Sequence, residues 1–142
     1  MSKIVVSGTI IEQLKAHAQT DAPNECCGLL SGREAVVETR HPLRNLSLTP
    51  ERNYFASPED LFRAMRKIRE GGQTLLAIYH SHPSGPPYPS KTDIEMASYP
   101  NVIHLIISLV AGTEILAFSI KDGVVAPVAL EVANATQLET TE

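Results

Sequence analysis

Two mostly apolar runs constrain the fold of this sequence more than any other feature: TLLAIYH at residues 74–80 and VIHLIISLV at residues 102–110. Runs of this length and composition are typical of strands that are buried on both faces. Such strands pack against helices that cover the sheet. The sequence therefore predicts an α/β or α+β domain, in which a mixed β-sheet is packed by two longer helices and one short one.

Cap residues and apolar periodicity place the other elements. A helix is predicted at residues 57–70 with Ser57 as its N-cap, and another at residues 9–20, where Thr9 and Glu12 fit a capping box. The residues expected in the core are Ile10, Ile11, Leu14 and Ala18 of the first helix and Leu61, Phe62, Ala64, Met65 and Ile68 of the second. The remaining elements are strands at 3–6, 26–32, 35–40, 114–120 and 124–132 and a short helix from Ser90.

The length and charge of the chain limit its class. With 142 residues and a formal net charge of −4, we expect one domain at residues 1–132 and a polar tail at residues 133–142. No nucleic-acid partner is expected, because basic residues do not cluster. No membrane contact is expected either, because no run approaches the roughly 18 apolar residues of a membrane helix. The N-terminus, MSKIVVSG, lacks a signal-peptide pattern, which favours a cytoplasmic protein.

The two cysteines, Cys26 and Cys27, are neighbours in the sequence. Two adjacent thiols do not form a disulfide framework. The favoured interpretation is that they are small buried side chains that point to opposite faces of a strand. A zinc ligand or a redox role is the alternative.

Residue types that can bind zinc lie at the end of the first apolar run and in the segment after it. His80 and His82 are two residues apart in a strand, so both project from the same face at its carboxyl end. Pro83 ends regular pairing, which is expected to leave His82 at an exposed mouth. Ser90 then fits a helix N-cap, and Asp93 at position N3 points back toward the helix start. Two imidazoles and one carboxylate would leave the fourth zinc position open, as in catalytic zinc sites.

A catalytic zinc centre also needs a group that transfers protons. Glu25, in the segment NECCGLL, is the candidate, and the Ser90 hydroxyl could donate a hydrogen bond to a developing oxyanion. Each piece also has a structural interpretation, because S-x-x-D is a common capping pattern and Glu25 can be a plain loop carboxylate. The joint spacing H-S-H-x7-S-x2-D is far more restrictive than any of its parts.

These residues together resemble the JAMM (MPN+) zinc metalloprotease family, whose pattern is an upstream glutamate plus H-[ST]-H-x7-S-x2-D. No position of this sequence departs from that pattern, and the resemblance extends over nearly the whole chain. It implies a curved mixed sheet flanked by helices, similar to the fold of cytidine deaminases, whose own signature is absent here. It also implies that His80, His82 and Asp93 bind zinc. Glu25 would then be the general acid/base, and Ser90 would stabilise the oxyanion.

A short chain containing NECCGLL resembles the bacterial and archaeal single-domain members of this family. That resemblance implies cleavage of an amide or isopeptide bond after the C-terminal Gly-Gly of a ubiquitin-like or sulfur-carrier protein, with Zn²⁺ as cofactor. A Gly-Gly tail is thin enough to lie in a narrow groove. The segments 41–56 and 83–89 are candidate walls of that groove, and Tyr54 and Tyr88 are candidate contacts to the tail.

Three alternatives stay open. The first is a catalytically silent MPN scaffold or binding module, which the complete motif disfavours. The second is a RadC-like JAMM protein, but such proteins normally carry an N-terminal helical region that this sequence does not show. The third is a peptidase of the phage-tail type, which usually comes with a second hydrolase domain.

Overall fold

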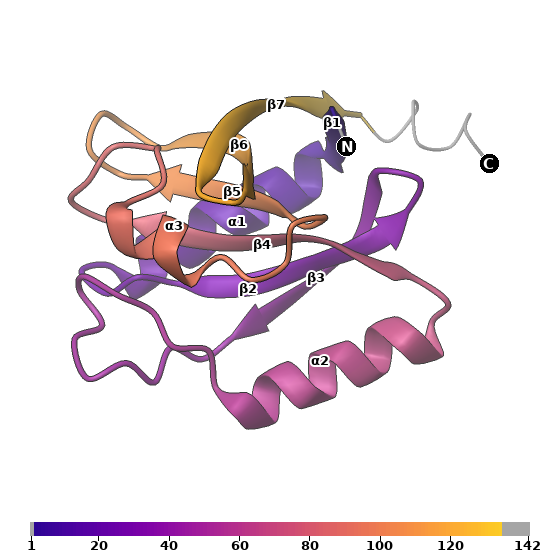
Figure 1. The fold of residues 1–142 in the computed structure, drawn as a ribbon, viewed down its shortest axis with the longest axis horizontal. Helices are drawn as coiled ribbons and strands as arrows, with labels where there is room; N and C mark the ends of the chain where they lie inside the picture. The colour runs from indigo at the N-terminus through magenta and orange to yellow at the C-terminus, as the bar shows by residue number, and fades with distance from the viewer. Residues whose placement is uncertain (1, 135–142) are drawn as a thin grey trace.

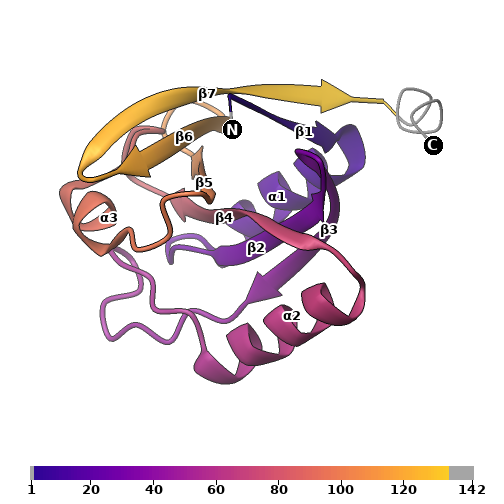
Figure 2. The same cartoon turned by 45° about the vertical axis from the view of Figure 1, so that its right-hand side comes forward.

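The computed structural model describes residues 2–134. Within these residues the predicted order of elements is confirmed, and the strands form one mixed sheet in the order β1-β3-β2-β4-β5-β6-β7. Figures 1 and 2 show that the sheet is strongly curved. The strands are β1 (Lys3–Ser7), β2 (Cys27–Arg33), β3 (Val36–Leu43), β4 (Thr74–His82), β5 (Ile103–Ser108), β6 (Glu114–Lys121) and β7 (Val124–Ala133), and the helices are α1 (Gly8–Asp21), α2 (Pro58–Glu70) and α3 (Lys91–Met96).

The sheet closes into a barrel, because β7 pairs with β1 as well as with β6. Pairing is parallel for β1 with β3, β1 with β7 and β4 with β5, and antiparallel elsewhere. The predicted α+β class with a mixed curved sheet is therefore confirmed. Closure was not predicted, because the contact between β1 and β3 is a single residue pair, Val5 with Val36, and no local pattern marks it.

Two apolar clusters lie on the two faces of the sheet. Helix α1 packs against one face through its four buried residues, which are the four predicted from the sequence. Helix α2 packs against the opposite face, below β3 in Figure 1, through Ala64 and Ile68 alone. The expectation that Leu61, Phe62 and Met65 lie in the core is wrong, because α2 rests on the outside of the sheet and meets it along a narrow stripe.

The helix starts agree with the sequence in part. Ser57 caps α2, and its Oγ accepts a hydrogen bond from Asp60 N at 3.2 Å. The N-cap of α1 is Ser7, whose Oγ accepts from Ile10 N at 3.2 Å. The predicted capping box of Thr9 and Glu12 is therefore wrong, because the helix begins immediately after β1 and leaves no room for a later cap.

Both thiols are free and buried, as favoured from the sequence. Cys26 belongs to the cluster under α1, and Cys27 to the cluster under α2, so the two side chains face opposite ways.

The last strand, β7, ends at Ala133, and most of the predicted tail, residues 135–142, lies outside the described residues. Among the described helices none has the length and apolarity needed to cross a membrane.

Candidate metal centre and active site

Strand β4 carries the two histidines into the interior of the sheet. It lies between β2 and β5, and its register pairs His80 with Cys27 and with Ile106. His82 still belongs to the strand, pairs with Ser108 and is only 8% exposed. The expected exposed position of His82 is therefore wrong, because β5 continues beside β4 to its last residue.

Asp93 reaches the histidines because of the way α3 begins. Ser90 is the N-cap of α3, and its Oγ accepts a hydrogen bond from Asp93 N at 3.0 Å. In return Ser90 N donates to Asp93 Oδ2 at 2.9 Å, which completes a capping box. This reciprocal pair turns the carboxylate back past the start of the helix and toward the end of β4.

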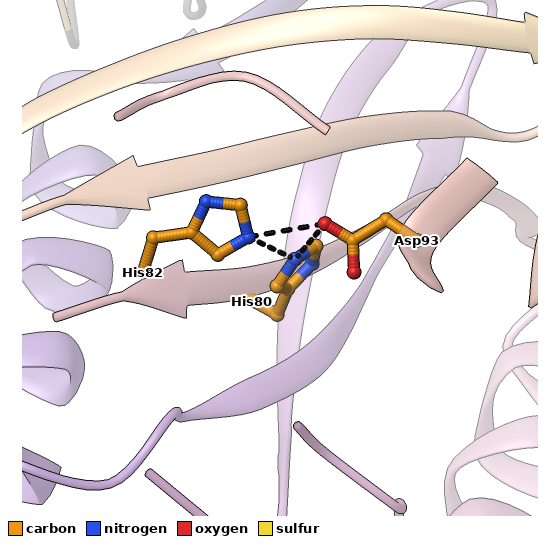
Figure 3. Close-up of side chains that lie close together, drawn as sticks. All are labelled: His80, His82 and Asp93. Atoms are coloured by element: carbon orange, nitrogen blue, oxygen red, sulfur yellow. Dashed lines mark hydrogen bonds and ion pairs between the residues drawn. The ribbon is translucent and has the colours of Figure 1, made fainter. Parts of the chain in front are cut away.

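Three ligand atoms converge at this point, as Figure 3 shows. His80 Nε2 lies 3.0 Å from His82 Nε2, and Asp93 Oδ2 lies 3.1 Å from the first and 3.0 Å from the second. Tetrahedral zinc with bonds of about 2.0–2.1 Å holds its ligand atoms about 3.3 Å apart, so the triangle would need to open by only about 0.3 Å.

The hydrogen bonds around His82 explain why this triangle suits a cation. Its Nδ1 lies 2.9 Å from the carbonyl oxygen of Pro86, so Nδ1 is the nitrogen that donates. In the neutral ring Nε2 then presents a lone pair toward Asp93 Oδ2, and two facing lone pairs repel each other unless a positive charge lies between them. The three residues therefore fit a zinc ion by donor type and by direction.

The pKa values of the cluster reflect the same charges. Burial alone would raise the pKa of Asp93, but hydrogen bonds from His80 and His82 hold it well below its usual range. In the absence of a metal, a second proton on His82 can supply this positive charge: burial opposes the charged ring, yet hydrogen bonds to Asp93 and to the Pro86 carbonyl raise the pKa of His82. The carboxylate is therefore ionised at neutral pH, as a metal ligand must be.

Glu25 lies beside this cluster at the start of β2. Ser81 N donates to Cys26 O at 3.1 Å, which extends the β2–β4 pairing by one residue and brings Glu25 alongside His82. Glu25 is 5% exposed. Burial raises the pKa of its carboxyl group to about 7, with a smaller opposing effect of His82 and a reinforcing effect of Asp93. A carboxyl group of this pKa can both accept and return a proton near neutral pH.

The segment after β3 covers Glu25 and His80. The first residues of the candidate wall segment 41–56 belong to β3, which extends to Leu43, and within the rest a single bridge joins Asn45 to Ala56. Glu25 N donates to Pro50 O at 2.7 Å, so this loop holds the backbone of Glu25. The Tyr54 ring stacks on His80 with a centroid distance of 4.8 Å.

Other residues near the centre were not identified from the sequence. His104 on β5 is buried, its Nε2 has no partner among the described residues, and its pKa is lowered by burial and by His80. A histidine inside the apolar run VIHLIIS was the available signal. Ser108 Oγ donates to Gly85 O at 2.7 Å and so ties the loop after β4 to β5. Tyr88, a predicted tail contact, is 51% exposed and lies edge-on against Phe118.

Several known proteins are similar to this chain in sequence. A desampylase of Haloferax volcanii is 35% identical over 102 residues, which cover 70% of this chain and 73% of the relative. A "Probable TtuB-protein conjugate cleaving protease" of Thermus thermophilus is 42% identical over 90 residues, covering 63% of this chain and 60% of the relative. A CysO-cysteine peptidase of Mycobacterium bovis is 31% identical over 107 residues, covering 74% and 73%.

Solved structures share the fold. A protein of Desulfitobacterium hafniense superposes with a TM-score of 0.84 at 33% identity, over 92% of this chain and 93% of that one. A JAB1/MPN domain protein of Archaeoglobus fulgidus superposes with a TM-score of 0.61 at 18% identity, over 92% and 99%, and supports the fold alone. The family model of prokaryotic homologues of the JAB domain matches residues 9–121. This chain therefore belongs to the prokaryotic JAB-domain family, and its fold is that of JAB1/MPN proteins.

Proposed function

We propose that this protein is a zinc-dependent isopeptidase-type hydrolase. Its substrate would be an amide or isopeptide bond that follows the C-terminal Gly-Gly of a ubiquitin-like or sulfur-carrier protein. The observation that carries the proposal is the convergence of His80 Nε2, His82 Nε2 and Asp93 Oδ2 within 3.1 Å of one another. The names of the relatives, a desampylase, a conjugate cleaving protease and a CysO-cysteine peptidase, support the substrate class.

In this proposal His80, His82 and Asp93 hold the zinc ion. When bound, zinc would act as a Lewis acid that activates water and polarises the scissile carbonyl. Glu25 would accept the proton of the attacking water and return it to the leaving amine, for which its pKa of about 7 is suited. The Ser90 Oγ accepts a hydrogen bond from Asp93 N, so its own proton is free to be donated to the oxyanion.

The rest of the proposal concerns the setting of the reaction. We expect a single catalytic domain at residues 1–132 that acts in the cytoplasm on a protein substrate. The net charge of −4 gives no electrostatic basis for binding nucleic acid or an anionic membrane surface. A metal-free scaffold would need no convergence of three ligand atoms beside a buried carboxyl group, so the scaffold alternative is not favoured.

The test is a cleavage assay on carrier proteins that are extended beyond Gly-Gly by a peptide, a lysine side chain or a cysteine. Product masses are measured with the parent protein, with a chelator, and with Glu25→Gln. We expect cleavage after Gly-Gly by the zinc-loaded parent, none with the chelator, and a loss of about 10²–10⁴-fold in Glu25→Gln. Glu12→Gln, on an exposed part of α1, is the matched control and should cleave like the parent. A Glu25→Gln variant as fast as the parent would contradict the assignment of Glu25.

A further inference from the structure

The ring of Tyr54 covers one face of the His80 imidazole. Their centroids are 4.8 Å apart and the planes are inclined by 29°, which is a stacked arrangement. Tyr54 is half-buried and packs against the same apolar cluster as α2, with Leu29 and Leu43. Its ring is therefore part of the wall behind His80, and the contact of Tyr54 to the substrate tail stays a prediction.

His80 lacks the support that its neighbour has. The orientation of a metal-binding histidine is usually set by a hydrogen bond from its other ring nitrogen to a carbonyl or carboxylate oxygen. His82 has this bond, from Nδ1 to Pro86 O at 2.9 Å. His80 Nδ1 is buried and has no partner among the described residues. Another contact must therefore hold the His80 ring in the plane that directs Nε2 at His82 and Asp93.

The backbone on both sides of Tyr54 is fixed by one side chain, Asn45. Its Nδ2 donates to Asn53 O at 3.1 Å, and its Oδ1 accepts from Phe55 N at 3.0 Å. The same Nδ2 donates to Glu25 O at 3.0 Å, which links the loop to the start of β2. Tyr54 is thus held between two anchored residues, and its ring is presented to His80 on a rigid support.

We infer that Tyr54 is a positioning residue of the metal centre: its ring, held by Asn45, orients His80 in place of a hydrogen bond at Nδ1. This inference rests on the proposed zinc site. The contact is made by the face of the ring. Phenylalanine at position 54 should therefore preserve the orientation of His80, while an aliphatic side chain of similar volume should not.

The test compares Tyr54→Phe and Tyr54→Leu with two matched controls. Phe55→Leu removes the neighbouring ring, which is 57% exposed, and Leu75→Ala removes a residue that packs against the same apolar cluster near the start of β4. The zinc dissociation constant of each folded protein is measured by competition with a chromophoric chelator. We expect Tyr54→Leu to bind zinc about tenfold more weakly than the parent, and the other three variants to stay within about twofold.

A second measurement is independent of zinc. Nuclear Overhauser contacts between the ring protons of Tyr54 and His80 are expected in the zinc-free parent, and their absence would overturn the inference. It would also be overturned if Tyr54→Leu bound zinc like the parent, or if Tyr54→Phe or either control were weakened as much as Tyr54→Leu. A parent that takes up no zinc would instead refute the proposed function, and the ring contact would still decide the orientation of His80.

Discussion

Replacing Glu25 by glutamine should make the zinc-free protein more resistant to rising pH. The carboxyl group has a pKa of about 7 in the folded protein because of burial, against 4.5 for the free side chain. The folded state therefore binds this proton more tightly than the unfolded state. The parent keeps its full stability below about pH 4.5 and loses part of it as the pH rises to about 7 and beyond.

The size of the effect follows from the shift. A rise from 4.5 to about 7, at 1.36 kcal/mol per pKa unit, corresponds to about 3 kcal/mol. Glu25 keeps 5% of its surface exposed, so water still screens part of this effect and the expected size is about 2–3 kcal/mol. A glutamine at this position carries no charge, and any cost of burying its amide is the same at every pH.

The assay is urea unfolding, followed by circular dichroism in the presence of a chelator, from about pH 4 to about pH 8.5. Relative to the parent, Glu25→Gln should gain about 2–3 kcal/mol in the free energy of unfolding across this range. Glu12→Gln, whose side chain is 74% exposed, should show no such change. A difference between Glu25→Gln and the parent that is flat with pH would show that Glu25 is not a buried carboxyl group of raised pKa.

Three other outcomes are expected. Asp93→Ala removes one converging ligand atom and half of a capping box. Metal analysis should therefore show loss of stoichiometric zinc, and the free energy of unfolding should fall by about 1 kcal/mol. Zinc retained at one ion per chain would contradict the ligand set. Gly28→Ala should cost about 1–3 kcal/mol, because a Cβ there would lie 2.3 Å from the Tyr79 ring, and an unchanged urea midpoint would refute this contact. Burial raises the pKa of Cys26 and Cys27 to about 12, so iodoacetamide should modify both in urea and neither in the folded protein at neutral pH, whereas rapid alkylation of the folded protein would show that the thiols are accessible.

The metal cluster could be predicted because its geometry is local. The two-residue period of a strand puts His80 and His82 on one face, and the cap at Ser90 turns Asp93 toward them. The burial of His82 could not be predicted in the same way. Whether the last residue of a strand is exposed depends on how far the neighbouring strand continues, and Ser108 on β5 lies far along the chain.

The same distinction applies to α2 and to the closed sheet. The apolar pattern of α2 predicted a helix, but five apolar residues span a wider arc than the sheet covers, and only Ala64 and Ile68 of the five are buried. The closure of the barrel depends on β1 pairing with β7, strands from opposite ends of the chain. Contacts of such long sequence separation leave no periodicity in either partner.

Glu25 could be predicted as a candidate base from the sequence, but its raised pKa could not. Its place before β2 is local, but its pKa of about 7 arises from burial. The loop after β3 bonds to the Glu25 backbone through Pro50 and Asn45 and so fixes where this residue lies. The same loop presents Tyr54 to His80. The loop after β3, which has no regular period, thus contacts both the proposed base and one proposed ligand. A change in this loop should therefore disturb proton transfer and metal binding together, although it alters no residue of the H-S-H-x7-S-x2-D pattern.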